Sequence, residues 1–237
     1  MDEFTARTVV EFLSILENEP LDTMYRGQGD LSWPLVPSIC RFAKYVDGGY
    51  DSISELENHL VEKFVQFSVP FQDLRCTNRL EQLVYCQHFG LPTRLLDWST
   101  NPLKALFFAV EDPKLDKMDA TVTVLFPKIW WESLQSMKMD IDALTALYPE
   151  SLHVRVISQN ACFTAFPLPE TGMEVEELLF ENYSDTIERL FRVLIPKEAK
   201  RSLRQQLAIF GVGHQSIYPG SDGVARWVKS VLSNFTA

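Results

Sequence analysis

Apolar residues recur every three or four positions in several parts of the chain, which is the spacing of one face of an α-helix. This pattern predicts helices over the following stretches: residues 5–18, 52–68, 80–89, 103–110, 128–137, 140–148, 197–211 and 221–232. The first of them has Thr5 as a candidate N-cap. The helix over 80–89 should end near His88, because Gly90 and Pro92 follow it.

Runs of β-branched and aromatic residues lie between these helices. They predict strands over the following stretches: residues 24–28, 93–98, 120–127, 152–166 with a bend or bulge at Gln159-Asn160, 188–196 and 214–219. Residues 31–42 should lie extended across the core, and residues 172–185 should form a loop. Because helices and strands do not alternate as regular βαβ units, the predicted class is α+β, with mixed or antiparallel sheets and flanking helices.

Composition and charge narrow the range of functions. The chain has 237 residues without a repeat or low-complexity linker, so a single domain over 1–237 is expected. A net charge of −10 argues against nonspecific binding to nucleic acid or to anionic membranes. Four cysteines without CxxC spacing, and no apolar run of about 20 residues, predict a cytoplasmic protein with reduced thiols. The four histidines show no metal-ligand spacing, so no metal is expected.

Residues 88–109, HFGLPTRLLDWSTNPLKALFFA, concentrate the side chains that can do chemistry. His88 ends a predicted helix, a short strand follows, and Ser99 or Thr100 is a candidate cap of the next helix, whose first turn accommodates Pro102. Backbone donors at a helix N-terminus, an imidazole and a guanidinium together suit an anion such as a phosphate. In the alternative interpretation, Arg94 and Asp97 form a buried ion pair that holds the strand against the His88 helix.

A second candidate stretch is MYRGQGD, a strand that runs into a glycine-rich turn. Arg26 lies at the end of this strand, and Gly27 and Gly29 allow a close backbone approach or a positive φ. Arg26 either binds a ligand or pairs with a carboxylate that pins the turn. The ligand-binding interpretation is favoured by the glycines beside it.

These two stretches resemble the FRG domain family. YRGQGD at 25–30 is similar to the aromatic-Arg-Gly signature of that family, and residues 87–110 resemble its longest motif. Supporting similarities are found in the following stretches: RVISQNACFTAFP at 155–167, FRVLIPKEAK at 191–200 and GVGHQSIYPGSDGVA at 211–225. The resemblance covers about residues 20–228. The family occurs in bacteria and in phage or mobile-element settings, which implies a role in conflict between them.

A weaker resemblance is to ADP-ribosyltransferases with an Arg–Ser–Glu signature. The order of Tyr25-Arg26-Gly27, a strand ending at Ser99, and an Ala/Phe-rich helix is similar to theirs. This resemblance implies that Arg26 holds an NAD phosphate and that Ser99 braces the nicotinamide pocket. The glutamate of such enzymes is absent, because the matching positions are Leu190 and Arg192. His88, Gln159, Glu188 or Gln215 could substitute for it.

The candidate site follows from both stretches. The candidate catalytic residues are Arg26, His88 and Ser99, and the candidate residues for binding a cofactor, possible NAD, are Tyr25, Arg26, Gly27, Gln28, Thr93, Arg94, Asp97, Asn101 and Gln159. One hypothesis is an enzyme that cleaves NAD and transfers ADP-ribose. The other is a non-enzymatic module that binds a nucleotide or a protein target through a degenerate pocket of the same kind. A metal-dependent hydrolase ranks below both, because no HxH or HExxH spacing occurs.

Overall fold

The computed structural model describes residues 1–43, 49–71, 78–131, 141–149, 154–172 and 174–230. Its eight strands form one sheet in the order β1-β8-β4-β2-β3-β7-β6-β5. The strands are β1 (Asp2–Thr5), β2 (Met24–Gln28), β3 (Leu95–Ser99), β4 (Ala120–Pro127), β5 (Trp130–Trp131), β6 (Thr145–Leu147), β7 (Ala161–Ala165) and β8 (Ile187–Ile195). Most neighbours are antiparallel, while β1 with β8 and β5 with β6 are parallel. The α+β class with a mixed sheet is therefore confirmed.

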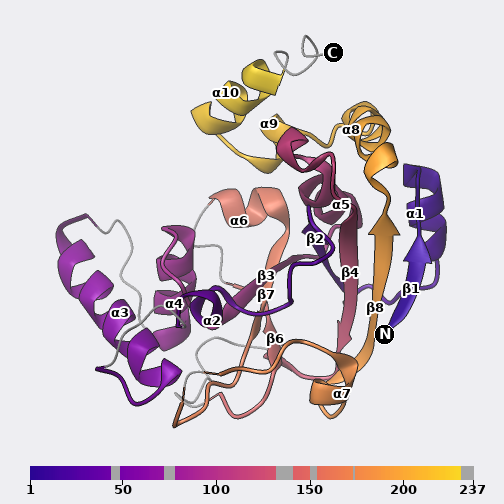
Figure 1. The fold of residues 1–237 in the computed structure, drawn as a ribbon. Coiled ribbons are helices and arrows are strands. Elements are labelled where there is room, and N and C mark those ends of the chain that lie inside the picture. The colour runs from indigo at the N-terminus through magenta and orange to yellow at the C-terminus, as the bar shows by residue number, and fades with distance from the viewer. Residues whose placement is uncertain (44–48, 72–77, 132–140, 150–153, 173, 231–237) are drawn as a thin grey trace.

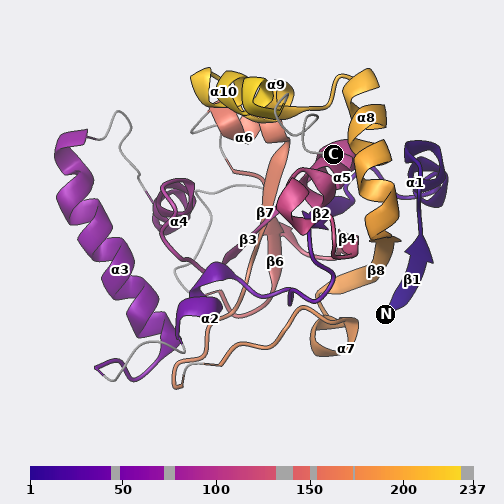
Figure 2. The same cartoon turned by 45° about the horizontal axis from the view of Figure 1, so that its top comes forward.

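Helices pack around this sheet (Figure 1). They are α1 (Val9–Ile15), α2 (Ser38–Ala43), α3 (Ile53–Ser68), α4 (Arg79–His88), α5 (Pro102–Val110), α6 (Val154–Gln159), α7 (Phe180–Tyr183), α8 (Lys200–Ile209), α9 (His214–Ile217) and α10 (Ser221–Ser230), with short 3₁₀ turns at Val69–Phe71, Pro113–Leu115 and Lys197–Ala199. Figure 2 shows α3 and α4 beside the half of the sheet that contains β3 and β7, and α1, α5 and α8 beside the half that contains β4 and β8.

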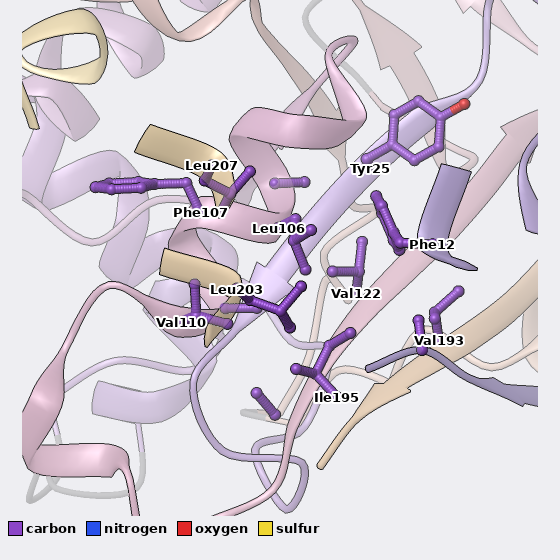
Figure 3. Close-up of a cluster of buried hydrophobic side chains, with 14 of the residues drawn as sticks. Phe12, Tyr25, Leu106, Phe107, Val110, Val122, Val193, Ile195, Leu203 and Leu207 are labelled. Carbon is purple, nitrogen blue, oxygen red and sulfur yellow. The ribbon is translucent and has the colours of Figure 1, made fainter. Parts of the chain in front are cut away.

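Each half of the sheet has its own apolar packing. The largest cluster joins α1, α5 and α8 to one face of β4 and β8, where Phe12, Leu106, Val122, Val193 and Leu203 meet (Figure 3). A second cluster packs α3 and α4 against β3 and β7. Each group of helices thus buries an apolar stripe against a different part of the sheet.

The two halves of the sheet meet at β2 and β3. β2 pairs with β4 over five residues, but with β3 only through Tyr25 and Ser99. On the edges where β2 and β3 face each other, the backbone groups beyond this pair are therefore available for contacts other than the ladder. This near-division of the sheet determines where the cavity described below lies.

Near the N-terminus, the predicted cap and length of the first helix and the extended segment predicted over 31–42 differ from the structure. Thr5 belongs to β1, and Thr8 caps α1 by accepting a hydrogen bond from the Glu11 backbone N–H at 3.1 Å. The helix is shorter than 5–18 because the chain first pairs with β8. Residues 38–43 form α2 instead of continuing the extended segment expected over 31–42.

Several short elements were also predicted in the wrong class. Within 140–148, where a helix was expected, residues 145–147 form β6, because pairing with β7 outweighs a short helical pattern. Trp130–Trp131 form β5, and residues 132–137 of the helix predicted there lie outside the described residues. Residues 180–183 of the expected loop form α7.

Of the strand pattern predicted over 152–166, the half after the bend at Gln159-Asn160 is confirmed as β7, whereas the half before the bend and the strand predicted over 214–219 contain helices. Residues 154–159 form α6, which ends at Asn160 with a φ of 48°, a conformation that asparagine tolerates better than most residues. Residues 214–217 form the single turn α9. Its start is stabilised by the Gly213 backbone N–H, which donates to the Ser216 hydroxyl at 3.0 Å.

Candidate functional site

A cavity of about 430 Å³ lies where β2 and β3 separate. It is lined by the candidate residues Tyr25, Arg26, Gly27, His88, Asp97, Ser99 and Gln159. Trp33, Phe108 and Phe163 contribute aromatic surface to its wall. Its volume is in the range of about 300–1,000 Å³ that is usual for small-molecule sites. The two stretches singled out in the sequence, residues 24–30 and 88–109, thus meet in one place.

The Tyr25-Arg26-Gly27 triplet has a structural explanation in β2. Alternate residues of a strand point to opposite faces, so Tyr25 and Gly27 share the face that packs against α5. A Cβ atom on Gly27 would lie 1.9 Å from the backbone oxygen of Ala105, so no other residue fits at this contact. The glycine lets the helix, rather than a ligand, approach the strand.

Arg26 occupies the gap between β2 and β3. Its Nη1 donates a hydrogen bond of 2.7 Å to the backbone oxygen of Asp97, which the short β2–β3 ladder leaves available. Its Nε is buried and has no hydrogen-bond partner among the described residues. Burial lowers the pKa of the Arg26 guanidinium from its ordinary value, while Asp97 raises it and Arg41 lowers it. In the described part of the chain, no carboxylate forms an ion pair with Arg26.

Ser99 fastens the end of β3. Its buried hydroxyl donates to the backbone oxygen of Gln159 at 2.7 Å and accepts from the Asn101 backbone N–H at 3.1 Å. Both contacts hold the cavity wall, since they tie β3 to the end of α6 and to the start of α5. The arrangement favours a bracing role over a nucleophilic one.

His88 reaches the cavity from the last turn of α4. The helix ends just after His88, as the sequence predicted, and Gly90 there adopts a φ of +84°. The imidazole packs edge-to-face against Phe89, with ring centroids 5.0 Å apart. Gln87 and Val84 line the same wall one turn or less away.

Four of the candidate residues lie outside the lining of the cavity: Gln28, Thr93, Arg94 and Asn101. The Gln28 amide donates to the backbone oxygen of Trp33 at 3.1 Å. The Thr93 hydroxyl donates to the side-chain oxygen of Gln87. The geometry therefore supports structural roles for these residues.

Asn101, not Ser99 or Thr100, caps α5. Its side-chain oxygen accepts hydrogen bonds from the backbone N–H groups of Leu103 and Lys104 at 3.0 and 3.2 Å. The predicted cap was wrong because the hydroxyl of Ser99 is already used across the cavity wall.

The interpretation of Arg94 and Asp97 as a buried ion pair was wrong. Arg94 pairs with Glu57 of α3, through its Nε at 2.7 Å and its backbone N–H at 2.6 Å. Both side chains are buried, whereas Asp97 is exposed and lines the cavity. A partner 37 residues away could not be identified from local spacing.

Sequence reasoning missed one carboxylate in the cavity, that of Glu111 at the end of α5. The Tyr218 hydroxyl lies 2.9 Å from each of its oxygens, and His214 Nδ1 lies 3.9 Å away. Burial and then Arg226 lower the pKa of His214. His214 and Tyr218 belong to the stretch 211–225, already noted in the sequence, which was the available signal.

The two positions that match the transferase glutamate lie away from the cavity lining. Leu190 is buried in an apolar cluster with Met24 and Trp98. Arg192 lies 3.7 Å from Glu177. The other suggested substitutes, Glu188 and Gln215, do not line the cavity either, while His88 and Gln159 do.

Comparison with known families identifies part of this architecture. Residues 22–118 match the model of the FRG domain. The chain contains an FRG domain. The matched segment supplies β2, β3, α4 and α5, and with them Arg26, His88 and Ser99. Gln159 and Phe163, which complete the cavity beside the FRG segment, come from α6 and β7.

Neither the curated proteins nor the solved structures compared with this FRG-domain chain include a match. In the ranges described above, no group of three or more His, Cys, Asp and Glu residues is arranged to hold a metal ion. No helix of the described residues is long and apolar enough to span a bilayer.

Proposed function

We propose that the cavity between β2 and β3 binds a nucleotide through Arg26, with NAD as the candidate ligand. The observation that carries the proposal is the state of the Arg26 guanidinium. It is largely surrounded by protein and lines the cavity, yet a backbone oxygen is its one described acceptor and its Nε has none among the described residues. A partly buried cation that forms no ion pair, with the exposed Asp97 carboxylate as its nearby opposite charge, is unfavourable, and an anionic ligand would relieve that cost.

The geometry of a guanidinium suits a phosphate in particular. Its planar fork can donate two parallel charge-assisted hydrogen bonds to phosphate oxygens. Arg26 is held in place by the Asp97 backbone oxygen, so little conformational freedom is lost when the ligand binds. Aromatic rings of Trp33 and Phe108 in the same wall offer stacking surface for a base.

The order of Arg26, Ser99 and α5 supports an ADP-ribosyltransferase-like use of this pocket. In that use the protein would cleave NAD and transfer ADP-ribose to an acceptor. Ser99 would brace the pocket, in keeping with its hydrogen bonds to Gln159 and Asn101. The setting in which the family occurs supports a role in bacterial or phage conflict.

A second candidate function is ligand or protein binding without turnover. It is favoured by the absence of a carboxylate at positions 190 and 192 and by the engagement of the Ser99 hydroxyl in the cavity wall. Nicotinamide release from NAD separates the two. Binding without release supports the module, and release that Arg26→Lys abolishes supports the enzyme.

Calorimetric titration with NAD and ADP-ribose tests nucleotide binding. Lysine keeps the charge of Arg26 but cannot form the two parallel bonds. Because a charged hydrogen bond contributes about 1.5–3 kcal/mol, Arg26→Lys should weaken binding roughly 10- to 150-fold. Arg201→Lys on the exposed side of α8 is the matched control and should bind like the wild type.

The outcomes separate the possibilities. If the wild type binds neither ligand at millimolar concentration, the nucleotide proposal fails and a protein target becomes the better candidate. If Arg26→Lys and the wild type bind equally, the ligand lies elsewhere. Unfolding curves of all variants show whether a loss of binding reflects a loss of fold.

A further inference from the structure

The cavity lining has two carboxylates besides Arg26, those of Asp97 on β3, whose backbone oxygen Arg26 contacts, and of Glu111. Glu111 ends α5, lines the cavity and has a side chain that is 20% exposed. The aromatic side chains of Phe108 and Trp33 line the same cavity. The site therefore offers a cation from β2 and a carboxylate from α5 to a single ligand.

The C-terminal elements hold this carboxylate. The Tyr218 hydroxyl lies 2.9 Å from both oxygens of Glu111, so its proton can be donated to either of them. Arg226 of α10 lies over the Tyr218 ring, 4.2 Å from its centroid. α10 in turn packs closely on α9, since a Cβ on Gly223 would lie 1.7 Å from the Tyr218 backbone oxygen. Tyr218 is thus fixed from two sides and restrains the Glu111 side chain.

The chemistry of a carboxylate determines which part of a nucleotide can contact it. A carboxylate accepts hydrogen bonds and repels phosphate, so the phosphates of a ligand bound at Arg26 would avoid it. Hydroxyl groups are suitable donors, and the ribose beyond the diphosphate carries them in NAD and, in greater number, in ADP-ribose. A ligand with an anion and a polyol side by side matches the Arg26 guanidinium and the Glu111 carboxylate.

We propose that the Glu111 carboxylate binds the hydroxyls of this second ribose, the nicotinamide ribose of NAD and the terminal ribose of ADP-ribose. Tyr218 is a positioning residue for Glu111. The proposal rests on the proposed function, because it requires that Arg26 binds the diphosphate. It goes further by assigning a role to a residue outside the candidate set predicted from the sequence.

ADP and ADP-ribose are the probes, because ADP-ribose carries the second ribose on the terminal phosphate, where ADP has one further negative charge instead. Calorimetry should show that the wild type binds ADP-ribose more tightly than ADP. Glu111→Gln should weaken ADP-ribose binding about tenfold, since it removes a charged acceptor. The same change should leave ADP affinity unchanged or raise it, because a negative charge near the phosphates is lost. Glu198→Gln, an exposed residue with the same charge change, should alter neither affinity.

Tyr218→Phe tests the positioning role. It should reduce the preference for ADP-ribose over ADP, whereas a merely structural effect would lower both affinities together. Retained ADP affinity also shows that each variant keeps a folded cavity.

Three results would overturn the inference. If the wild type binds ADP and ADP-ribose equally, the second ribose contributes nothing. If Glu111→Gln keeps the wild-type preference, or lowers both affinities in parallel, the carboxylate does not bind that ribose, while the role of Arg26 stands. If the wild type binds neither probe, the proposed function and this inference fail together.

Discussion

Replacing Glu57 with glutamine removes the charge against which Arg94 is buried. Glu57 is 0% exposed and Arg94 is 8% exposed, so water cannot substitute for the lost partner. The two oxygens of Glu57 accept from the Arg94 backbone N–H at 2.6 Å and from its Nε at 2.7 Å. Glutamine can preserve one of these bonds but places an amide donor where the other acceptor was.

The expected loss follows from these contacts. Each hydrogen bond to a charged group contributes about 1.5–3 kcal/mol, and breaking a buried ion pair typically costs about 3–5 kcal/mol. We therefore expect Glu57→Gln to lower the free energy of unfolding by about 3–5 kcal/mol. For a chain of this length the midpoint of thermal unfolding should fall by roughly 6–20 °C.

Urea unfolding followed by tryptophan fluorescence measures this loss, since the chain contains five tryptophans. A lower midpoint with an unchanged slope would report a change in stability rather than in the exposed surface. Asp97→Ala is the matched control, because Asp97 is exposed and should cost less than about 1 kcal/mol. The double variant Glu57→Leu with Arg94→Met should recover part of the stability, since it removes both charges but leaves the buried backbone N–H of residue 94 without its acceptor.

Two results would refute the reasoning. A change below about 1 kcal/mol for Glu57→Gln would mean that solvent reaches the pair. An equally large loss for Asp97→Ala would restore the pairing of Arg94 with Asp97 that the sequence suggested.

Three further predictions concern the local architecture. Gly27→Ala should lower the free energy of unfolding by about 1–3 kcal/mol or more, because the added Cβ meets the backbone of α5. Gly29→Ala should lower it less, because there the added Cβ meets the movable end of the Leu115 side chain. Urea unfolding curves of the two variants compare the losses directly. Asn101→Ala should lower the free energy of unfolding by about 0.5–2 kcal/mol, because it removes the N-cap of α5. Thr100→Ala should change it by no more than about 0.5 kcal/mol. Equal losses of stability for the two variants would contradict the assigned cap. His214 has a lowered pKa, so as the pH falls the unfolded chain binds a proton at this residue before the folded chain does. The free energy of unfolding of the wild type should therefore decrease below about pH 6.5. The free energy of unfolding of His214→Gln should decrease less over the same range.

The sequence by itself determined the long elements and the two motifs. Residues 53–68 form a helix because they carry a long helical period, and residues 120–127 and 187–195 form strands because they are long runs rich in β-branched and aromatic residues. The FRG signature predicted that Arg26, His88 and Ser99 belong together, and the cavity contains all three. Helix ends were predictable where glycine follows, as at Gly90 and Gly211.

Short elements depended on their neighbours instead. Residues 145–147 become a strand because β7 offers hydrogen bonds that a three-residue pattern cannot anticipate. Residues 214–217 become a helical turn because the chain folds back tightly between α8 and α10. In such short stretches a tertiary contact outweighs the local preference of the residues.

Partners distant in sequence were decided only by the tertiary structure. Arg94 pairs with Glu57 from α3, and Tyr218 meets Glu111 across 107 positions. The single-residue pairing of β2 with β3, which opens the cavity, is likewise a property of the assembled sheet. Spacing along the chain carries information about residues that share one helix or one strand. It carries none about which side chains meet when separate elements pack, because those distances exist only after the sheet and its helices have assembled.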